Sequence, residues 1–253
     1  MDFTGKKVLV TGGSRGIGRA AVEAFLERGA AVAVNGRTAD SAAQAIREMG
    51  GGDRLIPAPG DVAKVAGCEA AVAAAVDGLG GLDLLINSAG VGHGASIEDS
   101  DEALWDETLD VNLKGTFFCI KAALPALRKA SLGAIVNLAS DAGLIGEHRL
   151  TVYCASKGGV VNMTRAMALE IAPDVRVNCI CPGYVDTDMI SRDCIDKNED
   201  PSAVEQRMIN YAPMKRIATP AEISQGSSIW LHSTHVSLQV PALAIDGGST
   251  AGH

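Results

Sequence analysis

The chain has 253 residues, of which 47% are hydrophobic and only 4% aromatic, and it carries a formal net charge of −8. This length suits one α/β domain over residues 1–253, with a core of small aliphatic side chains. The acidic charge and the lack of any basic run argue against nucleic acid or an anionic membrane as a partner.

Apolar, β-branched runs alternate with alanine-rich patterns along most of the chain. The runs predict strands over residues 7–11, 31–35, 55–57, 82–87, 134–139, 175–181 and 242–245. The patterns between them predict helices over residues 16–28, 39–49, 64–79, 101–129, 151–172 and 220–232, the fourth bent near Gly115 and Pro125. Several strands are apolar almost throughout, so both of their faces are expected to be buried. This is typical of α/β proteins with a doubly wound parallel sheet between two layers of helices.

Residues 188–212 break this alternation because they are polar and charged. We expect them to form helices that stand off the sheet and act as a substrate lid, which excludes water when it closes. No internal repeat or low-complexity linker divides the chain.

Six cysteines stand at positions 68, 119, 154, 179, 181 and 194, without any Cys-x-x-Cys pair. We expect neither a disulfide framework nor a metal site, and interpret them as small apolar side chains in a reducing cytoplasm. Cys179 and Cys181 are expected to point to opposite faces of a strand. No run of about 18 apolar residues predicts a membrane span, and the N-terminus does not resemble a signal peptide.

The first strand runs into a glycine-rich turn, Thr11-Gly-Gly-Ser-Arg-Gly-Ile-Gly18, before the first helix. Gly12 allows a tight turn, while Gly16 and Gly18 let the backbone approach a pyrophosphate at the helix N-terminus. The spacing differs from the more common Gly-x-Gly-x-x-Gly. Taken alone, the motif also fits a plain strand-to-helix turn.

The end of the second strand bears on the choice between NAD and NADP. A carboxylate there would bind the ribose hydroxyls of NAD, but the sequence is Val34-Asn35-Gly36-Arg37. Arg37 and Arg15, in the glycine turn, offer two guanidinium groups that suit a 2′-phosphate. Solvent-facing surface arginines are the alternative. The sequence predicts NADP (NADPH) in preference to NAD.

Two further turns follow predicted strands at the same edge of the sheet. Asp61-Val62 follows the third strand, where a carboxylate is placed to accept a hydrogen bond from an adenine amino group. Asn87-Ser-Ala-Gly90 follows the fourth, where small residues let a cofactor pass. Each alone fits an ordinary turn, but ligands of open α/β sheets bind at this edge.

Tyr153 and Lys157 stand four positions apart in the predicted helix 151–172, so they share one helix face. Reduction of a ketone by hydride requires a proton for its oxygen. A tyrosine hydroxyl supplies one, although its ordinary pKa of about 10 is high. A neighbouring ammonium favours tyrosinate and lowers that pKa. The pair therefore predicts acid/base chemistry on a ketone or secondary alcohol.

Together these motifs resemble those of short-chain dehydrogenases/reductases over nearly the whole chain. The shared motifs are Thr11–Gly18, Asn87–Gly90, Asn112, Ser140, Tyr153-x-x-x-Lys157, Pro182-Gly183 and Asp246-Gly-Gly248. The resemblance implies a Rossmann-like fold, a nicotinamide cofactor and a homotetramer. Among members, 3-oxoacyl-[acyl-carrier-protein] reductases and sugar or polyol dehydrogenases are the most similar.

The resemblance also assigns four catalytic roles. Tyr153 is the acid/base, and Lys157 lowers its pKa while holding the nicotinamide ribose. Ser140 hydrogen-bonds the substrate oxygen. Asn112 supports a water that connects Lys157 to solvent, and its alternative is a hydrogen bond back to its own helix.

The nicotinamide is expected beside the turn after the sixth strand. The resemblance places Pro182-Gly183 against the ring, with the backbone of Val185 and the hydroxyl of Thr187 holding the carboxamide. Thr187 also fits an N-cap of the next segment. The expected cofactor contacts are Gly12, Ser14, Arg15, Gly16, Ile17, Gly18, Arg37, Asp61, Val62, Asn87, Ala89, Gly90, Tyr153, Lys157, Pro182, Gly183, Val185 and Thr187.

Two positions depart from the family pattern. Ser88 replaces an asparagine, and Val240-Pro241 stands where relatives carry a glycine, close to the subunit contacts of the family. The substrate is expected to contact residues 91–95, residues 141–151 and the lid. His93 and His148 are candidates there, although histidines in loops are more often solvated.

The function that follows is an NADP-dependent oxidoreductase for a ketone/secondary alcohol pair. A 3-oxoacyl-[acyl-carrier-protein] reductase or a sugar, polyol or cyclic alcohol dehydrogenase would be narrower alternatives. Arg128-Lys129 offers a basic patch for a carrier protein, but Asp174 adds an acid in the next loop. A non-catalytic NADP sensor is disfavoured because all four catalytic positions are kept.

Overall fold

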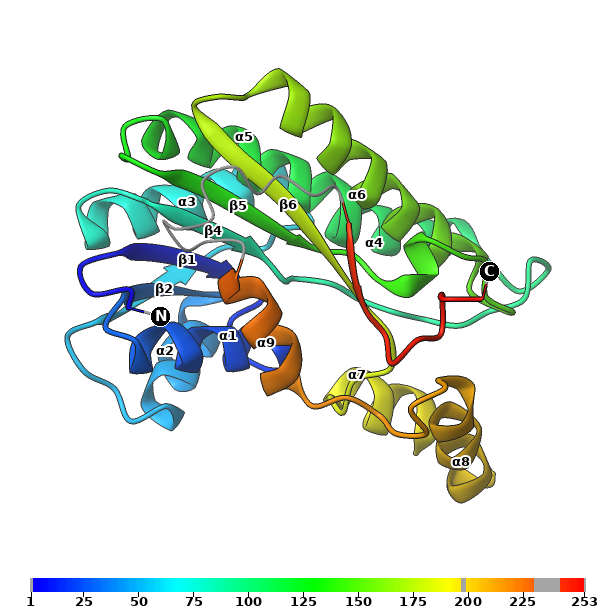
Figure 1. Ribbon diagram of the computed structural model, residues 1–253. Coiled ribbons are helices and arrows are strands. Elements are labelled where there is room, and N and C mark those ends of the chain that lie inside the picture. Colours follow the sequence, from blue (N-terminus) through cyan, green and yellow to red (C-terminus); the bar gives the residue numbers. More distant parts are fainter. Residues whose placement is uncertain (1, 197–198, 230–241, 253) are drawn as a thin grey trace.

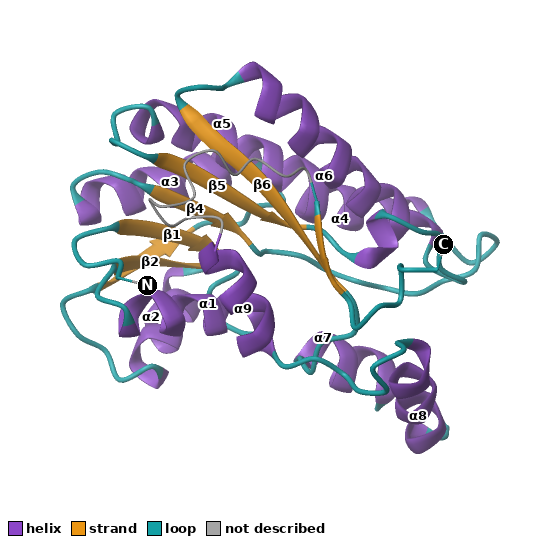
Figure 2. Ribbon diagram, in the orientation of Figure 1, coloured by secondary structure: helices purple, strands orange, loops and turns teal. Residues whose placement is uncertain are grey.

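The computed structural model describes residues 2–196, 199–229 and 242–252 (Figure 1). Seven parallel strands form one sheet in the order β3-β2-β1-β4-β5-β6-β7 (Figure 2). The strands are β1 (Lys7–Thr11), β2 (Ala31–Gly36), β3 (Leu55–Pro59), β4 (Leu84–Asn87), β5 (Gly133–Leu138), β6 (Val175–Pro182) and β7 (Leu243–Ile245). Val10 of β1 pairs with Val34 of β2 on one side and Ile86 of β4 on the other. The strand order reverses between β1 and β4, the position at which such sheets bind ligands.

Helices cover both faces of this sheet, as Figures 1 and 2 show. On one face lie α1 (Gly16–Glu27), α2 (Ala39–Glu48) and α9 (Pro220–Ile229). On the other lie α3 (Val65–Leu79), α5 (Gly115–Leu127) and α6 (Thr151–Glu170). The predicted doubly wound, three-layer α/β fold is confirmed.

The core follows from the two-residue period of the strands. In β1, Val8 and Val10 point to one face of the sheet and share a core cluster with Phe25 of α1. Leu9 points to the other face and shares a cluster with Ile120 of α5. All five are almost fully buried. Burying a side chain of this size stabilises the fold by about 1.5–3 kcal/mol. Apolar residues are therefore needed on both faces of the strand, as the sequence predicted.

The helix expected over residues 101–129 is interrupted. It consists of α4 (Glu102–Leu109), a π-helical turn (Asp110–Lys114) and α5. The irregularity ends where Gly115 begins α5, close to one of the two expected bends. A π turn widens a helix by one residue and is frequent at functional sites.

The segment expected to form a lid is helical in its described parts. It contains α7 (Asp188–Ile190), a π turn (Ser191–Ile195) and α8 (Pro201–Tyr211). Figure 1 shows α7 and α8 beyond the ends of the strands, apart from the two helix layers. Val240-Pro241 and the end of the helix expected over 220–232 lie outside the described residues.

All six cysteines are free. Cys179 and Cys181 belong to one buried cluster with Val160 and Val161 of α6. The expectation of opposite faces was wrong, because residues two apart on a strand point to the same face. Within residues 2–196, 199–229 and 242–252, no helix is long and apolar enough to cross a membrane, and no group of three potential metal ligands occurs.

Candidate active site

The glycine turn after β1 packs against the turn after β4. Gly12 has φ +62°, and a Cβ there would stand 2.8 Å from Ala89 Cα. A Cβ on Gly18 would lie 2.3 Å from Gly12 O, so α1 begins directly on the turn. Thr11 Oγ1 accepts hydrogen bonds from Ser88 N at 3.1 Å and Ala89 N at 3.2 Å. Neither glycine tolerates a side chain, and the resulting cradle fits the close backbone approach that a dinucleotide pyrophosphate requires.

Asn35, at the position expected to separate NAD from NADP, is a buried structural residue. Its Oδ1 accepts a hydrogen bond from Gly12 N at 3.2 Å, and its Nδ2 donates to Ala58 O at 2.9 Å and Gly60 O at 3.0 Å. The side chain of Asn35, at the end of β2, thus connects the turn after β1 with the end of β3 and the turn that follows it. The described structure places no carboxylate at the end of β2, and Arg37 beyond it is exposed.

The other expected adenosine contacts lie at the same edge. Arg15 precedes α1, and its guanidinium lies 4.0 Å from Asp188 of α7 with both side chains more than half exposed. Asp61 Oδ1 accepts a hydrogen bond from Ala63 N at 3.2 Å, which stabilises the turn after β3. Both ionic side chains are therefore near solvent, where a bound nucleotide is accessible to them.

Lys157 lies one turn after Tyr153 on α6 and is only 5% exposed. Its Nζ donates to Leu138 O at 2.9 Å and lies 5.7 Å from the centroid of the Tyr153 ring. Burial lowers the pKa of Lys157 to about 8. Burial also raises the pKa of Tyr153, although the Ser140 hydroxyl opposes the shift. The expected lowering of the Tyr153 pKa is absent in the free protein, because loss of solvation outweighs the hydrogen bond from Ser140.

Asn112 sits in the π turn and connects two parts of the site. Its Nδ2 donates to Val91 O at 2.9 Å and to Ser156 Oγ at 3.0 Å, while its Oδ1 accepts from Val91 N at 2.9 Å. The alternative of a back-bond to its own helix is wrong. Ser156 in turn donates to Tyr153 O at 2.8 Å. Asn112 thereby ties α6 to the loop after β4, where a Cβ on Gly90 would lie 3.5 Å from Lys157 Nζ.

Ser140 follows β5 and begins a short 3-10 turn (Asp141–Gly143). Its hydroxyl donates to Asp141 Oδ1 at 2.9 Å and lies 3.4 Å from Pro182 O, so β5 and β6 end side by side. Sequence reasoning included Asp141 in the substrate segment 141–151 but missed that its carboxyl is buried beside an expected catalytic hydroxyl. Its only sequence signal was an acid directly after Ser140.

Thr187 lies beside the glycine turn. A Cβ on Gly16 would stand 3.3 Å from its methyl group, so the segment after β6 closes over the start of α1. Its hydroxyl donates to Val185 O at 3.2 Å and makes no capping bond to α7. Thr187 nevertheless occupies the N-cap position of α7, so the N-cap alternative holds for its place in the chain but without a side-chain capping bond. Val185 is buried, and Gly183 packs against Asp246, where a Cβ would be 3.0 Å from Asp246 Cα.

The expected substrate segments do meet around Tyr153. A Cβ on Gly92 would lie 3.4 Å from Tyr153 Cε2 and 3.0 Å from Met189 Sδ of α7. Tyr184, after β6, donates to Glu147 Oε2 at 3.4 Å, and its ring packs edge-to-face on Tyr211 of α8 at 5.4 Å. Loop, lid and strand end thus form one wall beside the tyrosine.

The two candidate histidines are less central. His93 Nε2 lies 3.6 Å from Glu107 Oε2 of α4, and both side chains are partly exposed. His148 is exposed. These positions agree with solvated loop histidines.

The aromatic contact between Tyr184 and Tyr211 allows a test of the lid. Replacing Tyr211 by Ala is expected to raise the KM for the oxidisable substrate about threefold to tenfold, with little change in kcat, since an edge-to-face pair contributes about 0.5–1.5 kcal/mol. Steady-state kinetics at saturating cofactor measures both constants. Tyr211→Phe keeps the ring and should behave as wild type; an equal KM for the Ala variant would show that the lid does not close over substrate.

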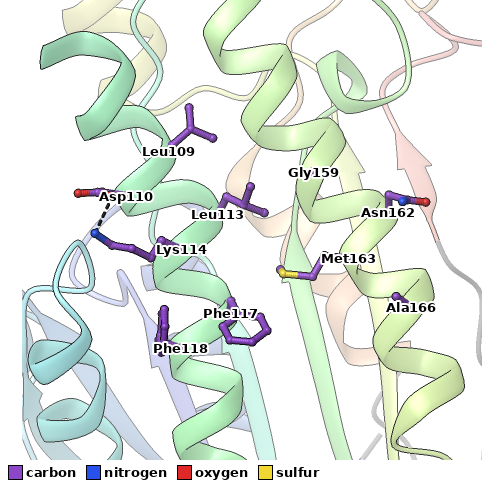
Figure 3. A pocket seen from close by; sticks show the side chains of 10 residues that line it. All are labelled: Leu109, Asp110, Leu113, Lys114, Phe117, Phe118, Gly159, Asn162, Met163 and Ala166. Carbon is purple, nitrogen blue, oxygen red and sulfur yellow. Dashed lines mark ion pairs between the residues drawn. The ribbon is translucent and has the colours of Figure 1, made fainter. Parts of the chain in front are cut away.

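A separate groove of about 550 Å³ lies between the α4–α5 region and α6 (Figure 3). Figure 3 shows Leu113 and Phe117 facing Met163 across it, with Lys114 paired to Asp110 at 2.6 Å on its rim. None of the four expected catalytic residues lines it. The groove is therefore not the candidate active site.

Residues 6–197 match the family model described as short chain dehydrogenase. The chain belongs to this family. It is accordingly an oxidoreductase that acts on CH–OH donors with a nicotinamide cofactor, and the resemblance inferred from its motifs is confirmed.

Three other short-chain dehydrogenases illustrate the similarity. The 2-(S)-hydroxypropyl-CoM dehydrogenase 3 of Xanthobacter autotrophicus is 36% identical over 246 residues, covering 96% of each chain. A solved short-chain dehydrogenase/reductase named glucose/ribitol dehydrogenase, from Brucella melitensis, has a TM-score of 0.89 and 30% identity, covering 98% of this chain and 99% of that one. The 3-ketoacyl-(acyl-carrier-protein) reductase of the same organism, solved with NADH, has a TM-score of 0.87 and 27% identity, covering 98% of this chain and 100% of that one.

Proposed function

We propose that this short-chain dehydrogenase interconverts a ketone and a secondary alcohol with NADP(H), using Tyr153 as the acid/base. The observation that carries the proposal is the pair of partly buried Tyr153 and buried Lys157, with Nζ 5.7 Å from the phenol ring. The pair stands at the carboxyl edge of the sheet beside Ser140, and a hydrogen bond from the Ser140 hydroxyl lowers the pKa of Tyr153 against the effect of burial. Paired, pKa-shifted groups in such a position are typical of catalytic sites.

Each residue of the site has a distinct task. When bound, a nicotinamide cofactor would supply the hydride for the carbonyl carbon, or accept it from the alcohol carbon. Tyr153 gives its phenolic proton to the substrate oxygen in reduction and takes it back in oxidation. Ser140 donates a hydrogen bond to that oxygen. Lys157 holds the cofactor ribose, and Asn112 fixes the loop and helix between which these groups lie.

The NADP preference rests on the end of β2. No described carboxylate stands there, the Asn35 side chain is hydrogen-bonded to Gly12, Ala58 and Gly60, and the exposed Arg37 is free to approach a 2′-phosphate. Replacing Arg37 by Asp is expected to weaken NADPH binding about tenfold to a hundredfold, because a charge-assisted hydrogen bond contributes about 1.5–3 kcal/mol. NADH binding should improve, since an acid accepts hydrogen bonds from ribose hydroxyls.

Cofactor fluorescence titration of both variants and both cofactors measures this change. Arg47→Asp, an exposed substitution in the last turn of α2, is the matched control and should leave both affinities near wild type. Equal affinity of Arg37→Asp and wild type for NADPH would exclude Arg37 as the phosphate ligand.

One assay distinguishes between the candidate classes of substrate. The initial rate of NADPH oxidation with an acetoacetyl thioester, with NADH in parallel, separates a 3-oxoacyl reductase from sugar, polyol and cyclic alcohol dehydrogenases. Arg128, half of the candidate carrier-protein patch, is paired with Asp174 at 3.3 Å, which weakens that patch. No turnover with the thioester, alongside tight NADPH binding, would therefore favour the polyol and cyclic substrates.

We also propose a cytoplasmic homotetramer. All six cysteines are free, in keeping with a reducing compartment. Exposed apolar side chains lie on α5 and α6: Phe117, 41% exposed, lines the groove of Figure 3, and Leu169 of α6 is 85% exposed. Light scattering coupled to gel filtration measures the mass; a monomer would contradict the proposal.

A further inference from the structure

A single hydroxyl lies between two carboxyl groups behind Ser140. Ser249 Oγ is 3.1 Å from Asp141 Oδ2 and 3.1 Å from Asp246 Oδ2. Ser249 is 8% exposed and Asp141 only 4%. The contact with Asp141 is buried and the contact with Asp246 is partly buried, and each needs a proton between its two oxygens to be favourable.

Ser249 supplies only one proton, because a hydroxyl is a single donor. Asp246 has other donors: Gly248 N reaches its Oδ1 at 2.9 Å, and Thr250 N and Oγ1 reach its Oδ2 at 2.9 and 2.5 Å. Apart from Ser249, the donors that the described residues offer to the Asp141 carboxyl both reach Oδ1, namely Ala142 N at 2.8 Å and Ser140 Oγ at 2.9 Å. Asp141 Oδ2 therefore depends on the contact with Ser249.

We propose that Asp141 carries the missing proton, and that as a neutral carboxyl it is a positioning residue for Ser140. Asp141 Oδ2–H donates to Ser249 Oγ, and Ser249 donates to the ionised Asp246. The order of donors then satisfies every oxygen in the chain from Ser140 to Asp246. The role in turnover rests on the proposed function, whereas the proton itself does not.

The surroundings favour this assignment. Burial raises the pKa of Asp141, and the charge of Asp246 adds to the shift against the hydrogen bonds from Ser140, Ser249 and Ala142. Burial of Asp246 is outweighed by hydrogen bonds from Thr250, Gly248 and Ser249, which lower its pKa. The two carboxyls are thus biased in opposite directions, as expected for groups that share one proton.

The other titratable groups facing Asp141 do not neutralise a charge there. They are Glu147 from the loop before α6, Tyr153 from α6, Tyr184 after β6 and Tyr211 from α8. All four are acids, which are neutral when protonated and negative when ionised, so none of them supplies a positive charge to Asp141. The ammonium of Lys157 is directed to Leu138 O instead.

The neutral state matters for the hydroxyl of Ser140, which also has only one proton. An ionised Asp141 would accept that proton in a charge-assisted bond, which is about twice as strong as a neutral one, and withhold it from the substrate oxygen. Its charge would also oppose formation of tyrosinate at Tyr153. A neutral Asp141 orients Ser140 and releases it when substrate binds.

Asn at position 141 reproduces the neutral acid, because its oxygen accepts from Ser140 and its amide donates to Ser249. Asp141→Ala is expected to lower kcat/KM about tenfold, and Asp141→Asn to restore it at low pH. As pH rises through the pKa of Asp141, wild type should lose activity relative to Asp141→Asn by about tenfold, the effect of one pKa unit on Tyr153. Dividing the kcat/KM of wild type by that of Asp141→Asn at each pH cancels the titration of every group that the two enzymes have in common, and leaves the titration of Asp141.

Infrared difference spectroscopy detects the protonation state of the Asp141 carboxyl without any need for turnover. The wild-type protein should show a protonated-carboxyl C=O band that shifts in deuterium oxide, disappears as pH rises and is absent in Asp141→Asn. Absence of the band, or parallel pH profiles, overturns the proposal. If the band is present but no ketone or alcohol turns over, the proton assignment stands and the proposed function fails.

A second variant covers the case in which Asp141→Asn does not fold. Ser249→Ala removes the hydroxyl that joins the two carboxyls and touches neither Ser140 nor Tyr153 directly. The band should move in frequency and pH midpoint because its hydrogen-bond partner is lost. An unchanged band and an unchanged pH profile would overturn the arrangement.

Discussion

Replacing Tyr153 by Phe is expected to lower kcat by about 10²–10⁴, because a positioned acid/base contributes that factor to proton transfer. The change removes one oxygen and keeps the ring that packs beside Lys157 and Gly92. Folding and NADPH affinity should therefore stay close to wild type. Stopped-flow measurement of NADPH oxidation under single-turnover conditions isolates the chemical step from product release.

The same variant separates an enzyme from a non-catalytic NADP sensor. A sensor would bind NADPH equally well with either residue and show no ketone reduction in the wild type. Tyr184→Phe is the matched control, since this tyrosine is also partly buried near the site, but its hydroxyl bonds Glu147. Unchanged turnover in Tyr153→Phe would sink the assignment of Tyr153 as the acid.

Local patterns predicted the strands well, because the two-residue period and a core on both faces leave little choice of residue. The boundaries failed where an apolar residue is buried for another reason. Leu82 extends the apolar run of β4, but strand pairing begins at Leu84, since Asp83 turns its carboxylate to Lys7 N at 2.9 Å. A buried side chain alone therefore does not mark the start of a strand.

The site was predicted as a set of residues but not as a network. Its missing members depend on contacts between distant parts of the chain. Asn112 in the π turn is paired with Val91, 21 residues away, and Ser249 reaches Asp141 across 108 residues. No local periodicity records such pairs. The bend near Gly115 was predicted, but the π turn that carries Asn112 and the burial of the acid beside Ser140 emerged only from the fold.

Replacing Lys157 by Met is expected to abolish activity and stabilise the free protein. The catalytic loss should be at least about 10²-fold, because the group that holds the ribose beside Tyr153 is removed. The charged amine of Lys157 destabilises the folded state, since burial lowers its pKa from 10.5 to about 8. That change corresponds to about 3 kcal/mol of destabilisation when the amine is charged.

The pH dependence gives the sign of this effect. Between pH 8 and 10.5 the unfolded chain keeps a proton on Lys157 that the folded protein has lost, so wild-type stability rises with pH in this window. Below pH 8 the full penalty applies. The methionine variant lacks the titration and should be about 2 kcal/mol more stable than wild type at pH 7, after about 1 kcal/mol is subtracted for the lost hydrogen bond to Leu138 O.

Denaturant unfolding of the cofactor-free protein at pH 7 and at pH 9.5 measures this difference, with the exposed Lys129→Met as control. The increase in the free energy of unfolding caused by Lys157→Met should be smaller at pH 9.5 than at pH 7. The change caused by Lys129→Met should be the same at both pH values. A destabilised methionine variant at pH 7 would mean that the amine is well solvated or paired in the folded state. Stabilisation with loss of turnover would instead show that the fold retains an unfavourable buried amine because the chemistry requires it there.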